Sequence, residues 1–269
     1  MIKKITSQDE IRSAVDYIGA DFKATPYMYV NLIRYGLGTD NVFSWIDQNE
    51  KGEIEGLYLL YYDCLHFYTK DVDGYPADRL LEFIDNTAHR VLMMPGAVGD
   101  RIDSHFPSYY SERNYVLDMD KVGLEEREYR SEIAKREDIN EIVDLLMADP
   151  EYMDVYDKEV LSKQLHDRFD DDFSRYIVVK MDGKVVATCS TYAEVDGFAI
   201  ISGVIVHPDY RRRGLAADVE LYACHILEEE KKSRVGFVNF NNDASFALQK
   251  KIGAFDVAIL AKLVKKDEE

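Results

Sequence analysis

Hydrophobic positions along the chain alternate between two spacings. Within residues 139–146, apolar side chains recur every three or four positions, which is the spacing of an amphipathic helix. Residues 176–180 and 185–192 are short apolar runs rich in β-branched residues, and Asp182-Gly183 lies between them, which predicts a hairpin. Helices and strands that alternate in this way predict an α/β (α+β) fold.

The second half of the chain gives the clearer order of elements. We expect a short strand near Ile133, helices over residues 139–146 and 158–169, and a three-stranded meander over residues 176–206. A helix from residue 215, a strand over 235–240, a helix over 243–250 and a last pair of strands within 255–264 complete the order.

The first half shows the same order more faintly. Ser7-Gln-Asp-Glu10 is a capping-box pattern that opens a helix. A helix over residues 27–35, a strand over 42–46, one or two strands within 54–68, a helix over 77–89 and a strand over 90–94 follow. Residues 133–139 also resemble residues 5–11. We therefore predict that the first half is a degenerate copy of the second, with domains at residues 1–124 and 129–269 and a linker near 122–128.

Composition narrows the class of protein. Of 269 residues, 46% are hydrophobic and 31% are charged, which is typical of a soluble globular protein. No apolar run approaches the ~20 residues of a membrane span, and no signal-peptide core follows the start, so we expect a cytoplasmic protein with no membrane partner. A net charge of −18 disfavours nucleic-acid binding, because contacts to phosphate supply most of that affinity. Cys64, Cys189 and Cys224 have no metal-binding spacing, so we expect buried thiols and no metal site.

Residues 204–217, Val-Ile-Val-His-Pro-Asp-Tyr-Arg-Arg-Arg-Gly-Leu-Ala-Ala, form the most informative stretch. The apolar run stops before Pro208, which lacks the N–H that a central strand needs, and helical spacing resumes after Gly214. The stretch therefore predicts a strand, a cationic loop and a helix. Such a loop places backbone N–H groups and the positive end of a helix around an anion. Gly214 would let the backbone approach a ligand closely.

Arg211-x-x-Gly214-x-Ala216 resembles the Arg/Gln-x-x-Gly-x-Gly/Ala motif of the GNAT acyltransferase superfamily, which holds the pyrophosphate of coenzyme A. The strand before it is similar to that family's splayed fourth strand, whose backbone binds the pantetheine arm and the thioester. The resemblance covers residues 129–265 and implies a GNAT fold there, with a mixed central sheet flanked by helices. It also implies acetyl-CoA as co-substrate. The residues that it assigns to the donor are Val204, Ile205, Val206, Arg211, Arg212, Arg213, Gly214, Leu215, Ala216, Ala217 and Asn242.

Asn242 belongs to a stretch that resembles the family's closing motif. An asparagine after the fifth strand contacts the pantetheine arm or the acetyl-bearing end in that family, although helix capping is an equally good role for this residue type. Gln249 stands where many members carry a tyrosine that protonates the leaving thiolate. The resemblance therefore leaves the general acid unassigned.

Several residues near the predicted site are candidates for proton transfer. Tyr192 is a candidate general acid, with Tyr222 or solvent as an alternative. Glu194, Asp196 and His207 are candidate bases, because direct attack on a thioester needs a neutral amine and something must accept its proton. Each of these also has a simpler interpretation as a surface or turn residue.

The corresponding loop of the first half, residues 70–77, carries Asp71 and Asp73. Two carboxylates where a diphosphate would dock repel it strongly in a partly buried site. We expect the first half not to bind coenzyme A in the family's manner, and to shape the acceptor cleft or a subunit contact instead.

The resemblance implies an acyl-CoA-dependent N-acyltransferase, in the simplest case an acetyltransferase, that acts on the amine of a small molecule or peptide. An alternative from another class is a coenzyme A-binding regulatory or scaffold protein with little or no transferase activity. Aminoacyl transfer from tRNA is a third alternative, which the acidic charge disfavours. The acceptor and the acyl chain length do not follow from the sequence. The oligomeric state is also open, and we expect a monomer or a homodimer.

Overall fold

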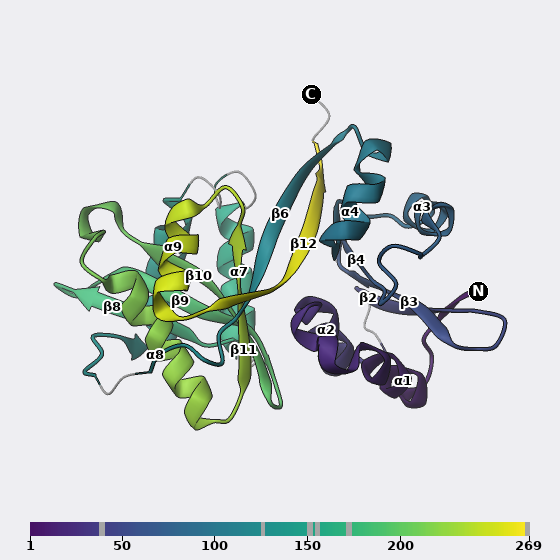
Figure 1. Ribbon diagram of the computed structural model, residues 1–269. Coiled ribbons are helices and arrows are strands. Elements are labelled where there is room, and N and C mark those ends of the chain that lie inside the picture. Colours follow the sequence, from purple (N-terminus) through teal and green to yellow (C-terminus); the bar gives the residue numbers. More distant parts are fainter. Residues whose placement is uncertain (38–40, 125–126, 150–152, 154–156, 171–173, 267–269) are drawn as a thin grey trace. The chain divides into compact units, whose positions relative to one another are not determined.

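The computed structural model describes all residues except 38–40, 125–126, 150–152, 154–156, 171–173 and 267–269. The chain forms two compact units (Figure 1). The first unit contains Met1–Leu117, Val238–Asp243 and Asp256–Glu269, and the second unit contains Asp118–Phe237 and Ala244–Phe255. Part of the predicted linker, residues 125–126, lies outside the described residues.

The sheet of the first unit has the strand order β1-β2-β3-β4-β5-β12-β6. Its strands are β1 (Ile2–Lys4), β2 (Val42–Gln48), β3 (Ile54–Tyr61), β4 (Cys64–Tyr68), β5 (Val91–Pro95), β6 (Tyr109–Asp118) and β12 (Phe255–Lys265). Its helices are α1 (Gln8–Ile18), α2 (Pro26–Tyr35), α3 (Ala77–Asp85) and α4 (Gly96–Ile102), with 3-10 turns η1 (Gly19–Lys23) and η2 (Asp103–His105).

Helices cover both faces of this sheet. Side chains alternate along a strand, so Leu57 and Leu59 of β3 pack in the core cluster of α1 and α2, while Tyr58 between them packs in the cluster of α3 and α4. The side chain of Ser7 accepts a hydrogen bond from the N–H of Glu10 and so caps α1, which confirms the predicted start of that helix.

The sheet of the second unit has the strand order β11-β10-β9-β8-β7. Its strands are β7 (Glu132–Ile133), β8 (Tyr176–Met181), β9 (Lys184–Val195), β10 (Phe198–Val206) and β11 (Ser233–Asn239). Its helices are α5 (Ile139–Met147), α7 (Lys158–Asp170), α8 (Leu215–Glu229) and α9 (Asp243–Ile252), with 3-10 turns η3 (Arg136–Asp138) and η4 (Pro208–Tyr210).

The second unit is also layered. Tyr176 and Val178 of β8 pack in one core cluster with apolar residues of α5 and α7. Helix α8 packs against β8, β9 and β10. Because Ile177 and Val179 point away from the α5–α7 cluster and are also buried, the sheet is covered on both faces.

The two units repeat one order of elements. In chain order, β1, α1, α2, β2, β3, β4, α3, β5, α4 and β6 correspond to β7, α5, α7, β8, β9, β10, α8, β11, α9 and β12. In both units the last strand of the meander runs parallel to the strand that follows, β4 beside β5 and β10 beside β11. The predicted duplication is confirmed at the level of the fold.

One predicted element is wrong. Residues 255–264, expected as a pair of strands, form the single long strand β12, because no Gly, Pro or Asn interrupts the run from Phe255 to Lys265. This strand follows α9 in the chain yet pairs antiparallel with β5 of the first unit, with Leu260 opposite Pro95. The limits of the compact units therefore differ from the predicted domain limits, 1–124 and 129–269. The predicted limits follow the repeated order of elements and stay a prediction.

The described residues also bear on the expectations for membrane spans, metal sites and cysteines. No helix among them is long and apolar enough to cross a membrane. In the same part of the chain, no group of three or more His, Cys, Asp or Glu side chains converges in a way that could hold a metal ion. Cys189 and Cys224 are buried free thiols, and Cys64 is half-buried.

Candidate functional site

Strand β10 leaves its neighbour β11 part-way along its length. The two strands pair in parallel from Phe198 opposite Ser233 to Ile201 opposite Gly236. On the other side, the register with β9 is irregular after Ser202, where Gly203 has a φ of +66°. Glycine adopts this conformation without the strain that a side chain would cause. Residues 203–206 thus lie beyond the described pairing with β11, so backbone groups on that side can bind an extended ligand.

The loop after β10 turns sharply into α8. Arg212 and Gly214 both have positive φ values, +62° and +77°. Gly214 is the N-cap of α8. A glycine cap offers no side-chain acceptor to the N–H groups of the first turn, so these groups and the positive helix end suit an external anion.

Two arginines of this loop also hold its shape. Arg211 Nε donates to the carbonyl oxygen of Val206 at 3.1 Å, and Arg213 Nη2 donates to that of Asp209 at 3.0 Å. Each guanidinium has five N–H donors, so both keep further donors for a ligand. The predicted strand, cationic loop and helix are all present, and their binding of coenzyme A stays a prediction.

A fourth arginine lies beside the loop and was missed by the sequence analysis. Arg130 Nη2 donates to the carbonyl oxygen of Arg213 at 3.1 Å and lies 3.7 Å from the position that a Cβ atom on Gly214 would take. The backbone N–H of Arg130 and the hydroxyl of Ser131 donate to the carboxylate of Asp218, in the first turn of α8, at 3.1 and 2.6 Å. Because 83 residues separate Arg130 from Arg213, no local motif could have revealed the contact.

A pocket opens beside the bend in β10. Its volume is about 520 Å³ with its open mouth included. Leu146 of α5 and Leu165 of α7 form part of an apolar wall, and Ser190 and Tyr192 of β9 form a polar one. Gly203 lines the same pocket, so a molecule held there can reach a group bound along β10.

Comparisons with known proteins agree with this geometry. Residues 139–254 match the sequence model of a family described as "Acetyltransferase (GNAT) family". The second half of the chain contains a GNAT domain. No curated protein matches the sequence.

Solved structures share the fold of the whole chain. A Drosophila protein is 14% identical with a TM-score of 0.69, and the match covers 98% of both chains. An acetyltransferase of the GNAT family from Colwellia psychrerythraea is 12% identical with a TM-score of 0.63, covering 99% of this chain and 100% of that one. A tandem GNAT protein from the clavulanic acid biosynthesis pathway is 12% identical with a TM-score of 0.59, covering 100% and 99%. At these identities the likeness shows the fold alone, which is that of tandem GNAT proteins.

Within the GNAT domain, Tyr192 is the catalytic candidate that lines the pocket. The guanidinium carbon of Arg168 lies 4.4 Å from the centre of the Tyr192 ring, and Arg168 Nη2 donates to the hydroxyl at 3.4 Å. The phenol and the guanidinium therefore form one polar cluster on the pocket wall. Tyr222, the alternative, instead packs against Tyr129 with ring centres 5.2 Å apart.

Glu194 lies in an ion-pair network. Its carboxylate accepts hydrogen bonds from Arg175 at 2.6 and 2.7 Å, from Lys232 at 2.7 Å and from the hydroxyl of Thr191 at 2.6 Å. Burial alone would raise the pKa of Glu194, but these hydrogen bonds outweigh it and hold the pKa below its ordinary value. An engaged carboxylate of lowered pKa is a weak proton acceptor, so the contacts favour a structural role.

His207 lies at the end of β10, on the side of the arginine loop. Its Nδ1 accepts from the N–H of Asp209 at 3.3 Å, and its ring packs edge-on against Tyr210 with centres 5.7 Å apart. It is not among the described residues that line the pocket. Of Tyr192, Glu194 and His207, the structure therefore brings only Tyr192 to the pocket wall.

The asparagine of the closing motif lies in the turn between β11 and α9. The backbone N–H of Asn242 donates to the carbonyl oxygen of Asn239 at 2.9 Å. This contact is made by the backbone and not by the side chain, so helix capping and contact with the donor both stay predictions. Gln249 is buried, and its Nε2 donates to Glu220 of α8. A glutamine amide has no labile proton to give a thiolate.

The corresponding loop of the first unit is closed by its own side chains. Asp71 Oδ1 accepts from the N–H of Gly74 at 2.9 Å, and a Cβ on Gly74 would lie 2.4 Å from that carboxylate. Arg101 of α4 donates to the carbonyl oxygens of Val72 and Tyr75 at 2.7 and 2.8 Å. A carboxylate of the chain thus takes an amide donor that an anionic ligand would need.

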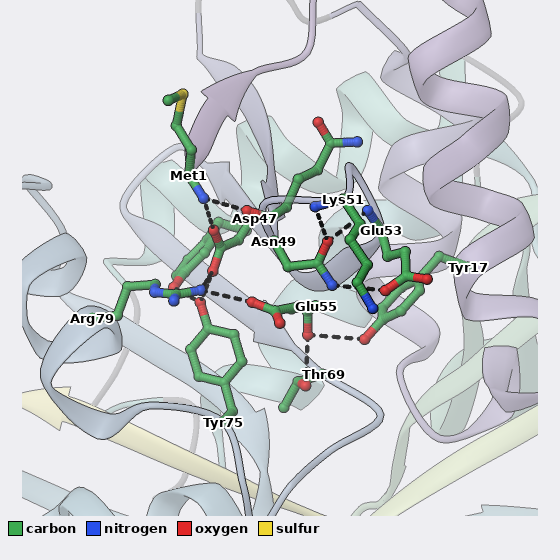
Figure 2. A network of polar contacts seen from close by, with 12 residues as sticks. Met1, Tyr17, Asp47, Asn49, Lys51, Glu53, Glu55, Thr69, Tyr75 and Arg79 are labelled. Atoms are coloured by element: carbon green, nitrogen blue, oxygen red, sulfur yellow. Dashed lines mark hydrogen bonds and ion pairs between the residues drawn. The ribbon is translucent and has the colours of Figure 1, made fainter.

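A polar network behind this loop joins β2, β3 and α3 (Figure 2). Asp47, which is fully buried, accepts from the hydroxyl of Tyr75 at 2.7 Å and from Arg79 at 2.6 Å, and Arg79 also donates to Glu55 at 2.8 Å. Burial alone would raise the pKa of Asp47, but the hydrogen bonds from Tyr75 and Arg79 outweigh it and lower the pKa. These internal contacts support the prediction that the first half does not bind coenzyme A in the manner of a GNAT domain.

Proposed function

We propose that the GNAT domain transfers an acyl group, acetyl in the simplest case, from acyl-CoA to the amine of a small molecule or peptide. The observation that carries the proposal is the bend of β10 at Gly203, followed by the loop Arg211–Gly214 and helix α8. A strand backbone, several cations and a helix N-terminus then follow one another along a short stretch of chain. This order suits a ligand with an amide-bearing arm and a pyrophosphate.

The donor would bind with its pyrophosphate at the start of α8. Arg211, Arg213 and Arg130 offer guanidinium donors there, and Arg130 is positioned by Asp218. The pantetheine arm would pair with the backbone of residues 203–206, which brings the thioester to the bend at Gly203. In a protein of net charge −18, this local group of cations is what favours an anionic donor.

The acceptor amine would enter through the pocket that Gly203 and Tyr192 line. Its nitrogen lone pair attacks the thioester carbonyl carbon, a C–N bond forms, the C–S bond breaks and coenzyme A leaves as a thiolate. Backbone N–H groups at the bend can stabilise the negative charge on the carbonyl oxygen. The nitrogen loses one proton and the thiolate gains one, and Tyr192 would donate the proton that the thiolate gains.

A second candidate function is coenzyme A binding without transfer. Two observations favour it. Gln249 is buried against Glu220 and cannot act as a general acid. Glu194 forms ion pairs with Arg175 and Lys232, which makes it a weak base. Neither observation removes the pocket, and a thiolate can leave without acid help at a rate reduced by about 10²–10⁴. We therefore place transfer first.

The deciding experiment follows thiol release from acetyl-CoA, with calorimetry of coenzyme A binding in parallel. Amines that differ in size and charge are tested one at a time, against a reaction without amine that measures hydrolysis. We expect binding and amine-dependent thiol release. Binding without release for any amine would favour the regulatory function, and absence of binding would overturn the donor site itself.

A further inference from the structure

A buried acid and a buried amide face each other between α8 and α9. Glu220 of α8 is 1% exposed and Gln249 of α9 is 4% exposed. Gln249 Nε2 donates to Glu220 Oε1. The other oxygen of each side chain, Glu220 Oε2 and Gln249 Oε1, has no hydrogen-bond partner among the described residues.

The protonation state of Glu220 decides whether these two atoms are satisfied. An ionised carboxylate only accepts hydrogen bonds, and so does the amide oxygen, so both buried acceptors would stay without a donor. A protonated carboxyl has an O–H that can donate to Gln249 Oε1 while its other oxygen keeps the existing bond. A buried polar atom without a partner is costly, so the protonated form fits this environment better.

We propose that Glu220 carries a proton in the folded protein and, with Gln249, forms a proton-dependent link between α8 and α9. The direction of the pKa agrees with the geometry: burial raises the pKa of Glu220 to about 7, and the hydrogen bond from Gln249 lowers it by less. Glu220 therefore loses its proton as the pH rises through the neutral range, and with it the O–H that can donate to Gln249 Oε1.

Among the described residues, burial and the hydrogen bond from Gln249 are what shift the pKa of Glu220, and no cation there holds it ionised. Cys189 of β9 and Cys224 of α8 interact with it electrostatically, and both are buried thiols whose pKa values are raised, first by burial and then by Glu220 itself. Arg234 of β11 acts on Cys224, but its Nη1 is bonded to Glu228 at 2.8 Å. Loss of the proton would leave a buried carboxylate beside two neutral thiols.

The link connects the two helices that carry the donor contacts of the proposed function. Helix α8 begins directly after Gly214, and α9 begins directly after Asn242. Weaker packing of α8 on α9 above neutral pH should therefore loosen the helix start that binds the pyrophosphate. This consequence rests on the proposed function, whereas the protonation of Glu220 does not.

The first test uses Glu220→Gln, because a glutamine can form both hydrogen bonds with Gln249 at every pH. Glu159→Gln is the control, since Glu159 is an exposed residue of α7 and the substitution changes the net charge equally. Hydrogen exchange of α8 and α9 amides in the full-length chain is compared between pH 5 and pH 8 after correction for intrinsic rates.

Between these two pH values, protection in the parent protein should fall by on the order of fifty-fold relative to Glu220→Gln. The factor follows from a tenfold change in the folding equilibrium for each pH unit between the ordinary value near 4.5 and about 7. Glu159→Gln should follow the parent. Equal pH dependence in the parent and Glu220→Gln would overturn the proposal.

A direct titration keeps the test valid if Glu220→Gln does not fold. In protein labelled with ¹³C at glutamate carboxyls, one signal should titrate near pH 7. That signal should move to a higher midpoint in Gln249→Leu, which removes the one hydrogen bond to the ionised form. A set of glutamate signals that all titrate below about pH 5 contradicts the proposal.

Coenzyme A affinity measured across the same pH range separates a failure of the proposed donor site from a failure of the proposed Glu220 link. We expect it to fall above pH 7 in the parent and to change less in Glu220→Gln. If coenzyme A does not bind at any pH, the proposed function fails while the titration still decides the state of Glu220. If binding has the same pH dependence in both proteins, the link does not reach the donor site.

Discussion

Arg130 Nη2 donates a hydrogen bond of 3.1 Å to the carbonyl oxygen of Arg213, which brings a cation from the segment before β7 to the loop that precedes α8. The contact is held in place by Asp218, whose carboxylate accepts the N–H of Arg130. An aspartate in the first turn of a helix that is proposed to bind an anion is at first sight unfavourable. Its contacts with Arg127 at 3.1 Å and with Ser131 at 2.6 Å show that its charge is used to position the cationic segment.

Arg130→Ala should weaken coenzyme A binding about tenfold, because one charge-assisted hydrogen bond contributes about 1.5–3 kcal/mol and the side chain is half exposed. Calorimetry at low and high salt measures the effect, which should shrink as salt screens the charge. Arg136→Ala is the control, since Arg136 pairs with Asp170 on the surface. Comparison with 3′-dephospho-CoA identifies the phosphate that is contacted. Unchanged affinity in Arg130→Ala would remove this residue from the site.

Gly214→Val should abolish coenzyme A binding and leave the protein folded. A β-branched side chain at a φ of +77° costs about 1–2 kcal/mol and displaces the backbone of the loop Arg211–Gly214. Gly183→Val is a matched control, because Gly183 has a φ of +76° in the β8–β9 turn and nothing within 4 Å of its Cβ position. Both variants should lose similar stability, but only Gly214→Val should lose affinity by a hundredfold or more. Retained binding in Gly214→Val would show that the donor lies elsewhere.

Tyr192→Phe should lower the turnover number about 10²-fold and leave coenzyme A affinity within twofold, because it removes a proton donor from the pocket wall without touching the arginine loop. Steady-state kinetics with a saturating amine measures the change. Tyr222→Phe serves as the comparison and should keep full turnover. The reverse result would assign the acid to Tyr222.

Glu194→Gln should keep turnover within about threefold but lower the free energy of unfolding by about 1–3 kcal/mol at pH 7, since Arg175 and Lys232 are partly exposed and lose one counter-charge. The pKa of Glu194 is lowered, so its stabilising contribution is present above the ordinary value of 4.5 and is lost as the pH falls through the lowered value. Denaturant unfolding at pH 7 and pH 3 should show the difference from the parent shrinking in acid. A large loss of turnover with unchanged stability would restore Glu194 as a base.

Calorimetry should find one coenzyme A per chain, bound by the second unit alone. Asp71→Ala removes the carboxylate that accepts from Gly74, and should lower the stability of the first unit by about 1 kcal/mol without adding a second binding site. Arg101 still holds the carbonyl oxygens of that loop. A stoichiometry of two in the parent or in Asp71→Ala would contradict our interpretation of the first unit.

Local patterns predicted most of the fold because its elements are specified by nearby residues. The Asp182-Gly183 turn, with φ values of +52° and +76°, sets the β8–β9 hairpin, and Ser7 sets the start of α1. The pairing of β12 could not be predicted in this way. Its apolar run indicated strand structure within residues 255–264, but the choice of β5 as a neighbour depends on contacts between residues about 165 positions apart in sequence, such as Leu260 and Pro95.

The candidate site, too, was predicted where its residues are contiguous and missed where they are distant in sequence. The sequence predicted the strand, the arginine loop and the helix because they are contiguous. The ion pairs of Glu194, the pocket around Tyr192 and the position of Arg130 depend on residues brought together by the fold. The buried acid Glu220 was missed for a related reason, because its neighbour Gln249 is 29 residues away. A glutamate in an amphipathic helix is predicted to be a surface residue, and only the structure shows that this one is buried.

The position of β12 has a consequence for the order in which the chain can fold during synthesis. Strand β5 is complete once residue 95 has left the ribosome, but its antiparallel neighbour consists of residues 255–265. Ala261 and Leu263 of that strand also belong to the core that α3 and α4 cover. The first unit therefore cannot close its core until the second has been made, and a ribosome that stalls within the GNAT domain would release a nascent chain with an exposed strand edge at β5.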